Sequence, residues 1–297
     1  MKKLKGFTKP LIWIPALLLT TIVAGCGGSD PILGTNPGAA GSTALGNLGT
    51  LATFGIASYG GVSNVNNGGT TKINGNVALN PTYTCNGAAV GATNDLSACI
   101  APNIPLNNSG DKVVTPIFPD TTTASSISAA LNTKWQSLSP ASLPGATVLG
   151  CGTIGTGGGG GVGIGCAGNA TLPPGNYISS TGSTIGITGT LTLNGTATDV
   201  WVFQTPSAAL TANVGSQIVL TGGAKASNVW WYVGSSATIG TNAIFNGNVL
   251  ASASISLQNL ATSCGRLLAG AGGSGAFVLD TNIVSVPGHP NAPAGCQ

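Results

Sequence analysis

From about residue 172 to residue 286, short apolar runs alternate with polar positions and are separated by Gly and Asn. Within most runs every second residue is apolar, which is the period of a β-strand with one buried face. The runs are about three to six residues long, too short for long antiparallel hairpins. The pattern therefore predicts many short strands joined by tight turns.

A degenerate repeat runs through this region. The segments 193–195 (LNG) and 199–203 (DVWVF) recur as 220–222 (LTG) and 228–232 (NVWWY), an offset of about 27 to 29 residues. A period in this range is typical of solenoids, in which each repeat forms one coil and stacks on the next. Three strands per repeat predict a coil of triangular section, with aliphatic and aromatic residues inside and Thr, Ser, Asn and Gly outside.

One segment has the period of a helix instead. After Asp120, a good N-cap residue, a single apolar stripe at spacings of four, four and three is formed by Ile127, Leu131, Trp135 and Leu138. Pro140 ends the pattern, so we expect a helix over about 121–139. The flank of the β domain is the surface available to bury its stripe.

Composition supports a folded β protein. Of 297 residues, 42% are apolar, only 5% are charged and 48 are glycine, and the mean hydropathy is +0.36. Disordered chains normally have low hydrophobicity and high net charge, so this composition argues against disorder. The chain can fill one large core.

Charge argues against nucleic-acid binding. Four of the nine basic residues (Lys2, Lys3, Lys5 and Lys9) precede residue 11, which leaves five against six acidic residues. A nearly neutral chain without a basic patch lacks the electrostatic footprint of a nucleic-acid-binding protein.

The N-terminus is typical of an export signal. Basic residues precede an apolar stretch over 11–24, and the segment 23–26 (VAGC) resembles the lipobox of bacterial lipoproteins. The resemblance implies a signal peptide over 1–25 and lipid attachment to Cys26. The alternative is an ordinary signal peptide followed by a chance cysteine. Gly27 suggests sorting to the outer membrane or cell surface in a Gram-negative host, and residues 26–43 read as a flexible tether.

Six further cysteines suggest disulfides in an exported chain: Cys85, Cys99, Cys151, Cys166, Cys264 and Cys296. Six thiols allow fifteen connectivities, and sequential pairing is our prediction. The first two pairs would each close a loop of about 15 residues, worth about 3 kcal/mol in the chain-entropy model. They would tie two irregular insertions, residues 81–110 and 144–170. A zinc site is disfavoured because the chain has no CxxC, and its one histidine, His289, lies in a Pro-rich tail over 287–297.

The ordered combination of motifs resembles the DUF3494 family of ice-binding proteins. The matching segments are 172–177 (LPPGNY), 191–195 (LTLNG), 199–204 (DVWVFQ), 222–224 (GGA), 228–231 (NVWW), 245–250 (FNGNVL) and 265–280. The resemblance covers about residues 44–286. It implies an all-β-dominated, right-handed, irregular parallel β-solenoid with one long helix alongside, in which N-terminal strands complete coils begun by the C-terminal part. It also implies adsorption to ice or ordered water through a flat face, without reaction or cofactor.

Strand alternation and one short motif then select uncharged positions as ice-binding candidates. They are Thr181, Thr184, Ala209, Thr211, Asn213, Thr238, Gly240, Ser254, Ser256 and Gln258. The first two belong to the segment 181–184 (TGST), which resembles a repeated motif on the ice face of some relatives. Thr and Ser are also ordinary solvent-facing strand residues, so the same ladder is compatible with a purely structural role.

Three other interpretations stay open. A sugar-stacking platform could be formed by Trp201, Trp230, Trp231 and Tyr232, although Trp201 and Trp230 occupy equivalent places in adjacent coils, which favours a core role. Arg266 could contact a ligand or bond a turn. The aspartates are scattered rather than paired, which disfavours a polysaccharide lyase or hydrolase. We expect a monomeric, non-enzymatic ice-binding protein. The alternative is a cell-surface adhesin or structural module of the same fold that binds a polymer or another surface component.

Overall fold

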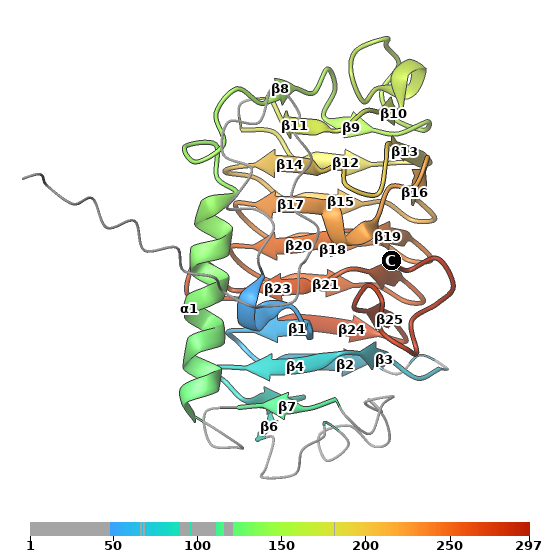
Figure 1. The fold of residues 1–297 in the computed structure, drawn as a ribbon. Coiled ribbons are helices and arrows are strands. Elements are labelled where there is room, and N and C mark those ends of the chain that lie inside the picture. Colours follow the sequence, from blue (N-terminus) through green and yellow to red (C-terminus); the bar gives the residue numbers. More distant parts are fainter. Residues whose placement is uncertain are drawn as a thin grey trace, which may run out of the picture.

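The computed structural model describes residues 48–65, 67, 69–89, 96, 111–115, 121–180 and 182–297. Three sheets form the walls of a solenoid, and one long helix lies along one wall (Figure 1). Strands within each sheet are parallel except for one antiparallel pair, β5 with β6. This is the predicted parallel β-solenoid with a flanking helix.

Sheet A has nine strands, in the order β7 (Val113–Val114), β4 (Asn76–Leu79), β1 (Phe54–Ser58), β23 (Leu267–Ala269), β20 (Asn248–Ala251), β17 (Val229–Val233), β14 (Trp201–Thr205), β11 (Gly175–Ile178) and β8 (Thr147–Val148). Sheet B also has nine, in the order β6 (Ala88–Ala89), β5 (Thr84–Cys85), β2 (Val62–Val65), β24 (Phe277–Asp280), β21 (Ile255–Leu257), β18 (Ala237–Ile239), β15 (Leu210–Ala212), β12 (Ile185–Ile187) and β9 (Thr153–Ile154).

Sheet C has seven strands, in the order β10 (Thr171–Leu172), β13 (Thr190–Asn194), β16 (Gln217–Thr221), β19 (Ile244–Asn246), β22 (Thr262–Cys264), β25 (Ile283–Ser285) and β3 (Lys72–Asn74). The helix α1 spans Thr121–Ser137, and short 3-10 turns occur at Gly49–Leu51, Ala167–Asn169 and Ala226–Asn228.

The coils differ in length. Trp201 pairs with Val229, which matches the predicted offset of about 28 residues. Ala237 pairs with Ile255, so the next coil takes only about 18. The strands stay in register because the difference is absorbed by the corner turns, where no ladder constrains the chain length.

The N-terminal strands close the solenoid, as the family resemblance implies. β1, β2 and β3 pair with β23, β24 and β25, one partner in each sheet. Buried Arg266 reinforces this seam, because its Nε and Nη2 donate to the Ala52 carbonyl at 2.8 and 2.6 Å and its Nη1 donates to Asn248 Oδ1 at 3.1 Å. Arg266 therefore holds the N-terminal segment in place, which is the turn-bonding role rather than a ligand contact.

Aromatic side chains stack through the core. The Phe203 ring lies 5.3 Å from Tyr177 and 4.1 Å from Trp231, centroid to centroid. The equivalence of Trp201 and Trp230 was wrong: Trp201 pairs with Val229, and Trp230 pairs with Val202. Adjacent residues of a strand face opposite sides, so the one-residue shift puts Trp201 in the core and Trp230 outside, under α1.

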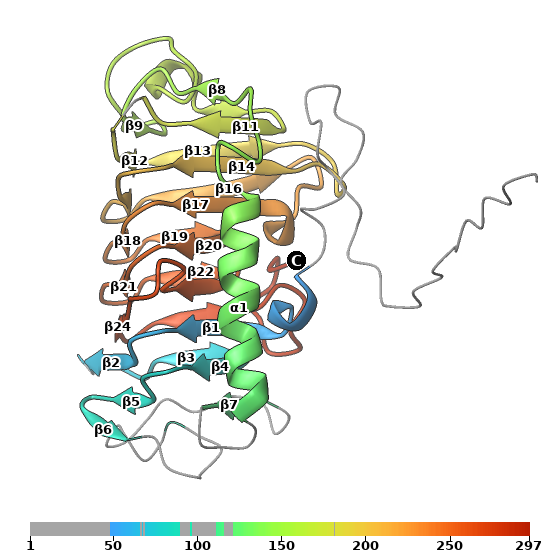
Figure 2. The same cartoon turned by 90° about the vertical axis from the view of Figure 1, so that its left-hand side faces the viewer.

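Helix α1 covers sheet A (Figure 2). Its predicted stripe is the buried face: Ile127, Leu131 and Leu138 are buried. Trp135 stacks on Tyr232 with centroids 4.7 Å apart, and its Nε1 donates to the Val233 carbonyl at 3.2 Å. Lys134 Nζ lies 4.3 Å from the centre of the Trp230 ring. The helix ends at Ser137, two residues before the predicted end, with Leu138 still packed against the sheet.

Residues 144–170 are not an insertion outside the solenoid. Their strands β8 and β9 extend sheets A and B, and together with β10, which directly follows them and extends sheet C, they form a terminal coil. The predicted disulfide Cys151–Cys166 lies within this coil. The sequence reasoning missed the strands because each has only two residues, too few to show a period.

Within the other predicted insertion, residues 81–110, the described part includes the hairpin of β5 and β6. Cys99 lies outside the described residues, so its pairing with Cys85 stays a prediction. Residues 1–47, with the lipobox and Cys26, also lie outside them.

The C-terminal tail, residues 287–297, packs on sheet C rather than extending from the domain. The disulfide Cys264–Cys296 joins it to β22. Asn74 Nδ2 donates to the Asn291 carbonyl at 3.1 Å, and His289 Nε2 lies 3.3 Å from Asp111 Oδ1. The tail therefore bridges C-terminal coils and the N-terminal strands.

Candidate functional site

The outer face of sheet B carries small side chains in straight columns. In β15, β18 and β21 the first and third residues are buried and the middle one is half-buried on the outer face, whereas in β12 the middle residue is the buried Gly186. The buried partners are aliphatic, Leu210, Ala237 and Ile255 for example, and they stack in register across coils. The core thus fixes which residues face out, and the ladder fixes their alignment.

The central column runs through seven strands. Its members, in the order of the strands, are Thr153, Gly186, Thr211, Thr238, Ser256, Val278 and Ser63, and each is paired in register with the next. Every member is half-buried or exposed except Gly186, which has no side chain to expose. The middle of the column, Thr211 to Ser256, is a ladder of hydroxyl-bearing side chains.

Two flanking columns lie on either side. The first column contains Thr184, Ala209, Ser236, Ser254 and Ala276. Four backbone hydrogen bonds between neighbouring coils align it: Ile185 N to Ala209 O, Leu210 N to Ser236 O, Ala237 N to Ser254 O and Ile255 N to Ala276 O. The second contains Thr188, Asn213, Gly240, Gln258, Asp280 and Val65, two residues beyond the central column. Here Asn213 Nδ2 donates to Thr188 Oγ1 at 2.5 Å, which links neighbouring coils.

The predicted positions lie in these columns. Nine of the ten candidates are described, and all nine fall in register on sheet B, whereas Thr181 lies outside the described residues. Gly240 is buried rather than exposed, and a Cβ there would collide with the Ala212 carbonyl, so the position has no room for a side chain. It contributes a flat stretch of backbone and no functional group.

Sequence reasoning missed several members of the columns. Thr153 was assigned to an insertion, and Gly186, Thr188 and Ser236 were passed over although they sit at the same outward phase. Their alternation with buried Ile185, Ile187 and Ala237 was the available signal. The period within a strand was visible, but the pairing between strands was not.

Regular spacing makes this face a lattice. Strands in a sheet lie about 4.8 Å apart, and outward residues along a strand are about 7 Å apart. Backbone ladders and the stacked core hold every position, so the groups keep their spacing without a ligand. In Figure 2 the strands of sheet B run down the left-hand side, and no described element lies outside them in that view.

Charge is nearly absent from the columns. Asp280 is their one charged member among the described residues, near the end formed by β24 and β2. It accepts hydrogen bonds from Asn67 Nδ2 at 2.8 Å, Asn259 Nδ2 at 3.2 Å and Thr281 Oγ1 at 3.2 Å. Desolvation would raise the pKa of Asp280, but these hydrogen bonds outweigh it and hold the pKa below its ordinary value.

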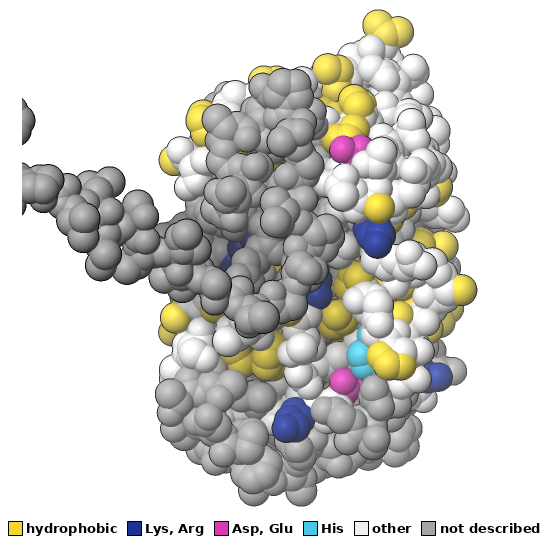
Figure 3. Space-filling model, in the orientation of Figure 1, with side chains coloured by type: hydrophobic (Ala, Val, Ile, Leu, Met, Phe, Trp, Pro, Cys, Tyr) yellow, Lys and Arg dark blue, Asp and Glu magenta, His cyan; other side chains and the backbone are white. Residues whose placement is uncertain are grey.

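Low charge extends beyond sheet B. On the side of the molecule seen in Figure 3, Lys, Arg and Asp side chains are scattered singly among uncharged ones. Across the described residues, no group of three or more His, Cys, Asp or Glu could hold a metal ion.

The Ice-binding-like family model matches residues 59–285, about three quarters of the chain and nearly the whole described solenoid. The chain belongs to the ice-binding-like family. Membership accounts for the order of the motifs and for the closure of the solenoid by N-terminal strands.

Individual relatives agree. An ice-binding protein of Flavobacterium frigoris (strain PS1) is 35% identical over 126 residues, which is 42% of this chain and 43% of the relative. The chain thus spans less than half the length of that relative. The crystal structure of an ice-binding protein from the Antarctic ascomycete Antarctomyces psychrotrophicus superimposes with a TM-score of 0.60 at 32% identity, covering 81% of this chain and 97% of the other.

A glycosylated ice-binding protein from an Arctic yeast has a TM-score of 0.63 at 23% identity, covering 83% of this chain and 95% of the other, and this likeness supports the fold. Family membership therefore rests on sequence and fold together. In the described part of this family member, no helix is long and apolar enough to cross a membrane.

Proposed function

We propose that this protein adsorbs to ice through the outer face of sheet B, without catalysing a reaction. The observation that carries the proposal is the in-register central column, with Thr211, Thr238 and Ser256 aligned across three successive coils. Family membership makes ice the first ligand to consider.

The chemistry of the columns suits a water lattice. Thr and Ser hydroxyls donate and accept hydrogen bonds, so they can replace water neighbours at a surface. The Thr methyl groups and Ala209 are apolar and leave adjacent water bonded mainly to itself. Because water must be ordered before it joins ice, a rigid template lowers the entropic cost of ordering it.

The absence of charge on the columns matters for ice adsorption as much as the regular spacing of their side chains. A charged side chain binds its hydration shell strongly and orients it radially, which conflicts with the ice lattice. Columns that lack charge from β9 to β21 avoid this conflict, and Asp280 marks where the favourable region ends. The proposed site therefore comprises the coils between β9 and β21.

The test is nanolitre osmometry with observation of ice-crystal shape on residues 27–297. Thr211→Tyr and Thr238→Tyr put a bulky ring on the central column, and we expect each to remove most of the thermal hysteresis. Thr192→Tyr is the matched control, since Thr192 points outward from sheet C. Hysteresis that survives both sheet B variants would place the site elsewhere. A parent without hysteresis or ice shaping would contradict ice binding itself.

We further infer that the protein is exported and held at the membrane by lipid on Cys26. The lipobox-like segment at 23–26 supports this. Cys26→Ser should move the protein from the membrane fraction to the soluble exported fraction, which membrane fractionation and labelling with a fatty-acid analogue would measure. An unlabelled wild-type protein would favour the ordinary signal peptide.

A further inference from the structure

A second concave surface lies on the helix side of the molecule. A groove of about 320 Å³ runs between α1 and the turn that joins β23 to β24. Its lining comes from Tyr59, Ser128, Asn132, Trp135 and the turn residues Gly270, Ala271, Gly272 and Gly273. None of these residues belongs to the three columns of sheet B.

Aromatic rings form two walls of this groove. Trp135 is held rigidly, since one side of its ring stacks on Tyr232 and its Nε1 bonds the Val233 carbonyl. The rest of the half-buried indole lines the groove. Tyr59 also lines the groove, and its Cβ and backbone pack directly against Gly270. The Trp135 ring is therefore positioned before any ligand arrives.

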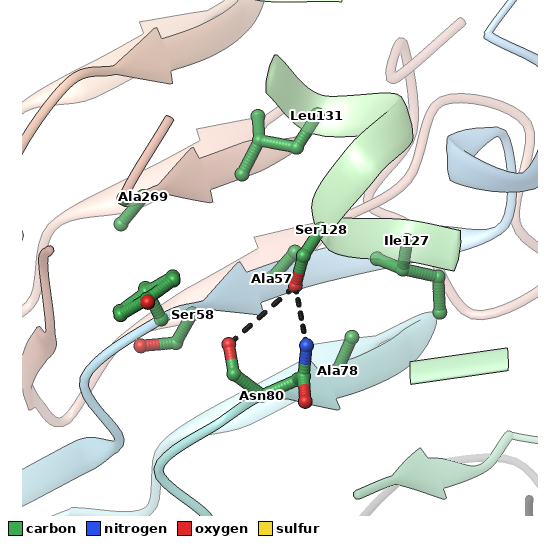
Figure 4. Close-up of a pocket in the computed structure, with 10 residues that line it drawn as sticks. Ala57, Ser58, Ala78, Asn80, Ile127, Ser128, Leu131 and Ala269 are labelled. Carbon is green, nitrogen blue, oxygen red and sulfur yellow. Dashed lines mark hydrogen bonds between the residues drawn. The ribbon is translucent and has the colours of Figure 1, made fainter. Parts of the chain in front are cut away.

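The remaining lining is uncharged and consists of Ser128, Asn132 and the small residues of the turn. Asn132 Nδ2 donates to the Ala271 carbonyl at 2.7 Å, which ties the helix to the turn. A separate, smaller pocket shares Tyr59, Ser128 and Gly270 with the groove, and there Asn80 Nδ2 donates to Ser128 Oγ at 2.7 Å (Figure 4). Gly273 has a φ of +87°, and no atom lies within 4 Å of the place where its side chain would begin.

We propose that this groove binds a neutral saccharide unit of a polysaccharide. A pyranose ring has an apolar C–H face that packs on aromatic rings and a rim of hydroxyls that bond amides, hydroxyls and backbone groups, which are the two kinds of surface the groove offers. Its volume is at the small end of ligand pockets, enough for one or two rings. Uncharged lining residues favour a neutral sugar over an acidic one.

This assignment is independent of ice adsorption. Together the two sites would let one face of the protein meet ice while the helix side holds a surface polymer. The turn that forms the groove leads into β24 of sheet B, so the two surfaces meet at the same edge of the solenoid.

Saturation-transfer NMR and calorimetry with maltotetraose, cellotetraose and the tetramer of N-acetylglucosamine test the proposal on residues 27–297. We expect at least one to bind with a Kd on the order of 1 mM, typical of a shallow site. Gly273→Asn should weaken binding at least about tenfold, because Asn tolerates positive φ and its side chain fills the groove.

Gly288→Asn is the matched control: Gly288 also has a positive φ, +79°, and open space around it, but it lies in the tail. Its binding should equal that of the parent, and the melting temperatures of both variants show whether they fold. Absence of saturable binding to all three sugars would overturn the proposal, as would binding that Gly273→Asn retains. Equal affinity for the monosaccharide and its tetramer would overturn the assignment to a polymer. Thermal hysteresis should be unchanged in both variants, which separates this test from that of ice binding.

Discussion

Sheets A and B are built from the same coils, yet one is covered and the other is open. Outward residues of sheet A are large and apolar, and α1 buries them: Val202, Trp230, Tyr232, Leu250 and Leu268. Those of sheet B are mostly Thr, Ser, Ala and Gly, and all except Gly186 and Gly240 stay at least partly exposed. Since the ladders are alike, the size and polarity of the outward side chains decide which wall gains a cover.

Free energy explains the difference. Burying a Leu or Trp under a helix contributes about 2 kcal/mol or more per side chain. Covering a Thr ladder would remove hydroxyls from water and require a partner for each. An amphipathic helix therefore packs on sheet A, and sheet B remains available to a ligand that can itself hydrogen-bond.

The largest effect should come from the covered wall. Leu131→Ala, in the buried stripe of α1, is expected to lower the free energy of unfolding by about 2 to 4 kcal/mol, since it leaves a cavity over sheet A. Thr238→Ala on sheet B should change it by less than about 0.5 kcal/mol. Urea denaturation of both variants measures this contrast, and similar losses would contradict it.

Sheet C gives an intermediate case, because the disulfide-linked tail covers it. Cys296→Ser removes a link across 32 residues and should lower the free energy of unfolding by about 4 kcal/mol in the chain-entropy model. Hysteresis should persist at temperatures where the variant stays folded, since sheet B is untouched. Melting by circular dichroism, with osmometry alongside, measures both, and a loss of hysteresis in the folded variant would show that the tail side takes part in ice binding.

A smaller effect is expected at the corner between sheets B and C. Leu260 has a φ of +59°, a strained conformation for a branched side chain, and is 50% exposed. Leu260→Asn should therefore raise the free energy of unfolding by about 0.5 to 1 kcal/mol. If hysteresis falls as stability rises, the corner belongs to the ice-binding surface and the boundary proposed above is wrong.

Changing pH should have the least effect on sheet B. Its one described charge, Asp280, has a lowered pKa, so it stays ionised at neutral and mildly acidic pH. Stability from its hydrogen bonds is present above the ordinary carboxyl pKa and is lost as pH falls through the lower folded value. Hysteresis should thus be constant between about pH 5 and pH 9. A marked change in that window would implicate a titrating group in adsorption.

Much of the architecture could be predicted because it is local. Strand alternation identified buried Ile239 and Ile255 and outward Thr211 and Ser256, since a period of two needs no partner to be visible. Helical spacing located α1 to within two residues at its end. The pairing of N-terminal strands with C-terminal ones was predicted from the family resemblance, because no local pattern in the sequence indicates it.

Other features needed the folded chain. The two-residue strands of the terminal coil, the inequivalence of Trp201 and Trp230, and the docking of the tail depend on pairing between distant segments.

The sequence alone determined the short strands, the amphipathic helix and the uncharged outward residues, because each follows from side-chain type at a fixed local period. Only the tertiary structure decided that Thr153, Thr211 and Thr238 share one column, that sheet A is covered and sheet B open, and that Tyr59 and Trp135 face one groove. The corner turns between strands differ in length from coil to coil, so spacing along the sequence does not give the register. The register is fixed only when the strands pair.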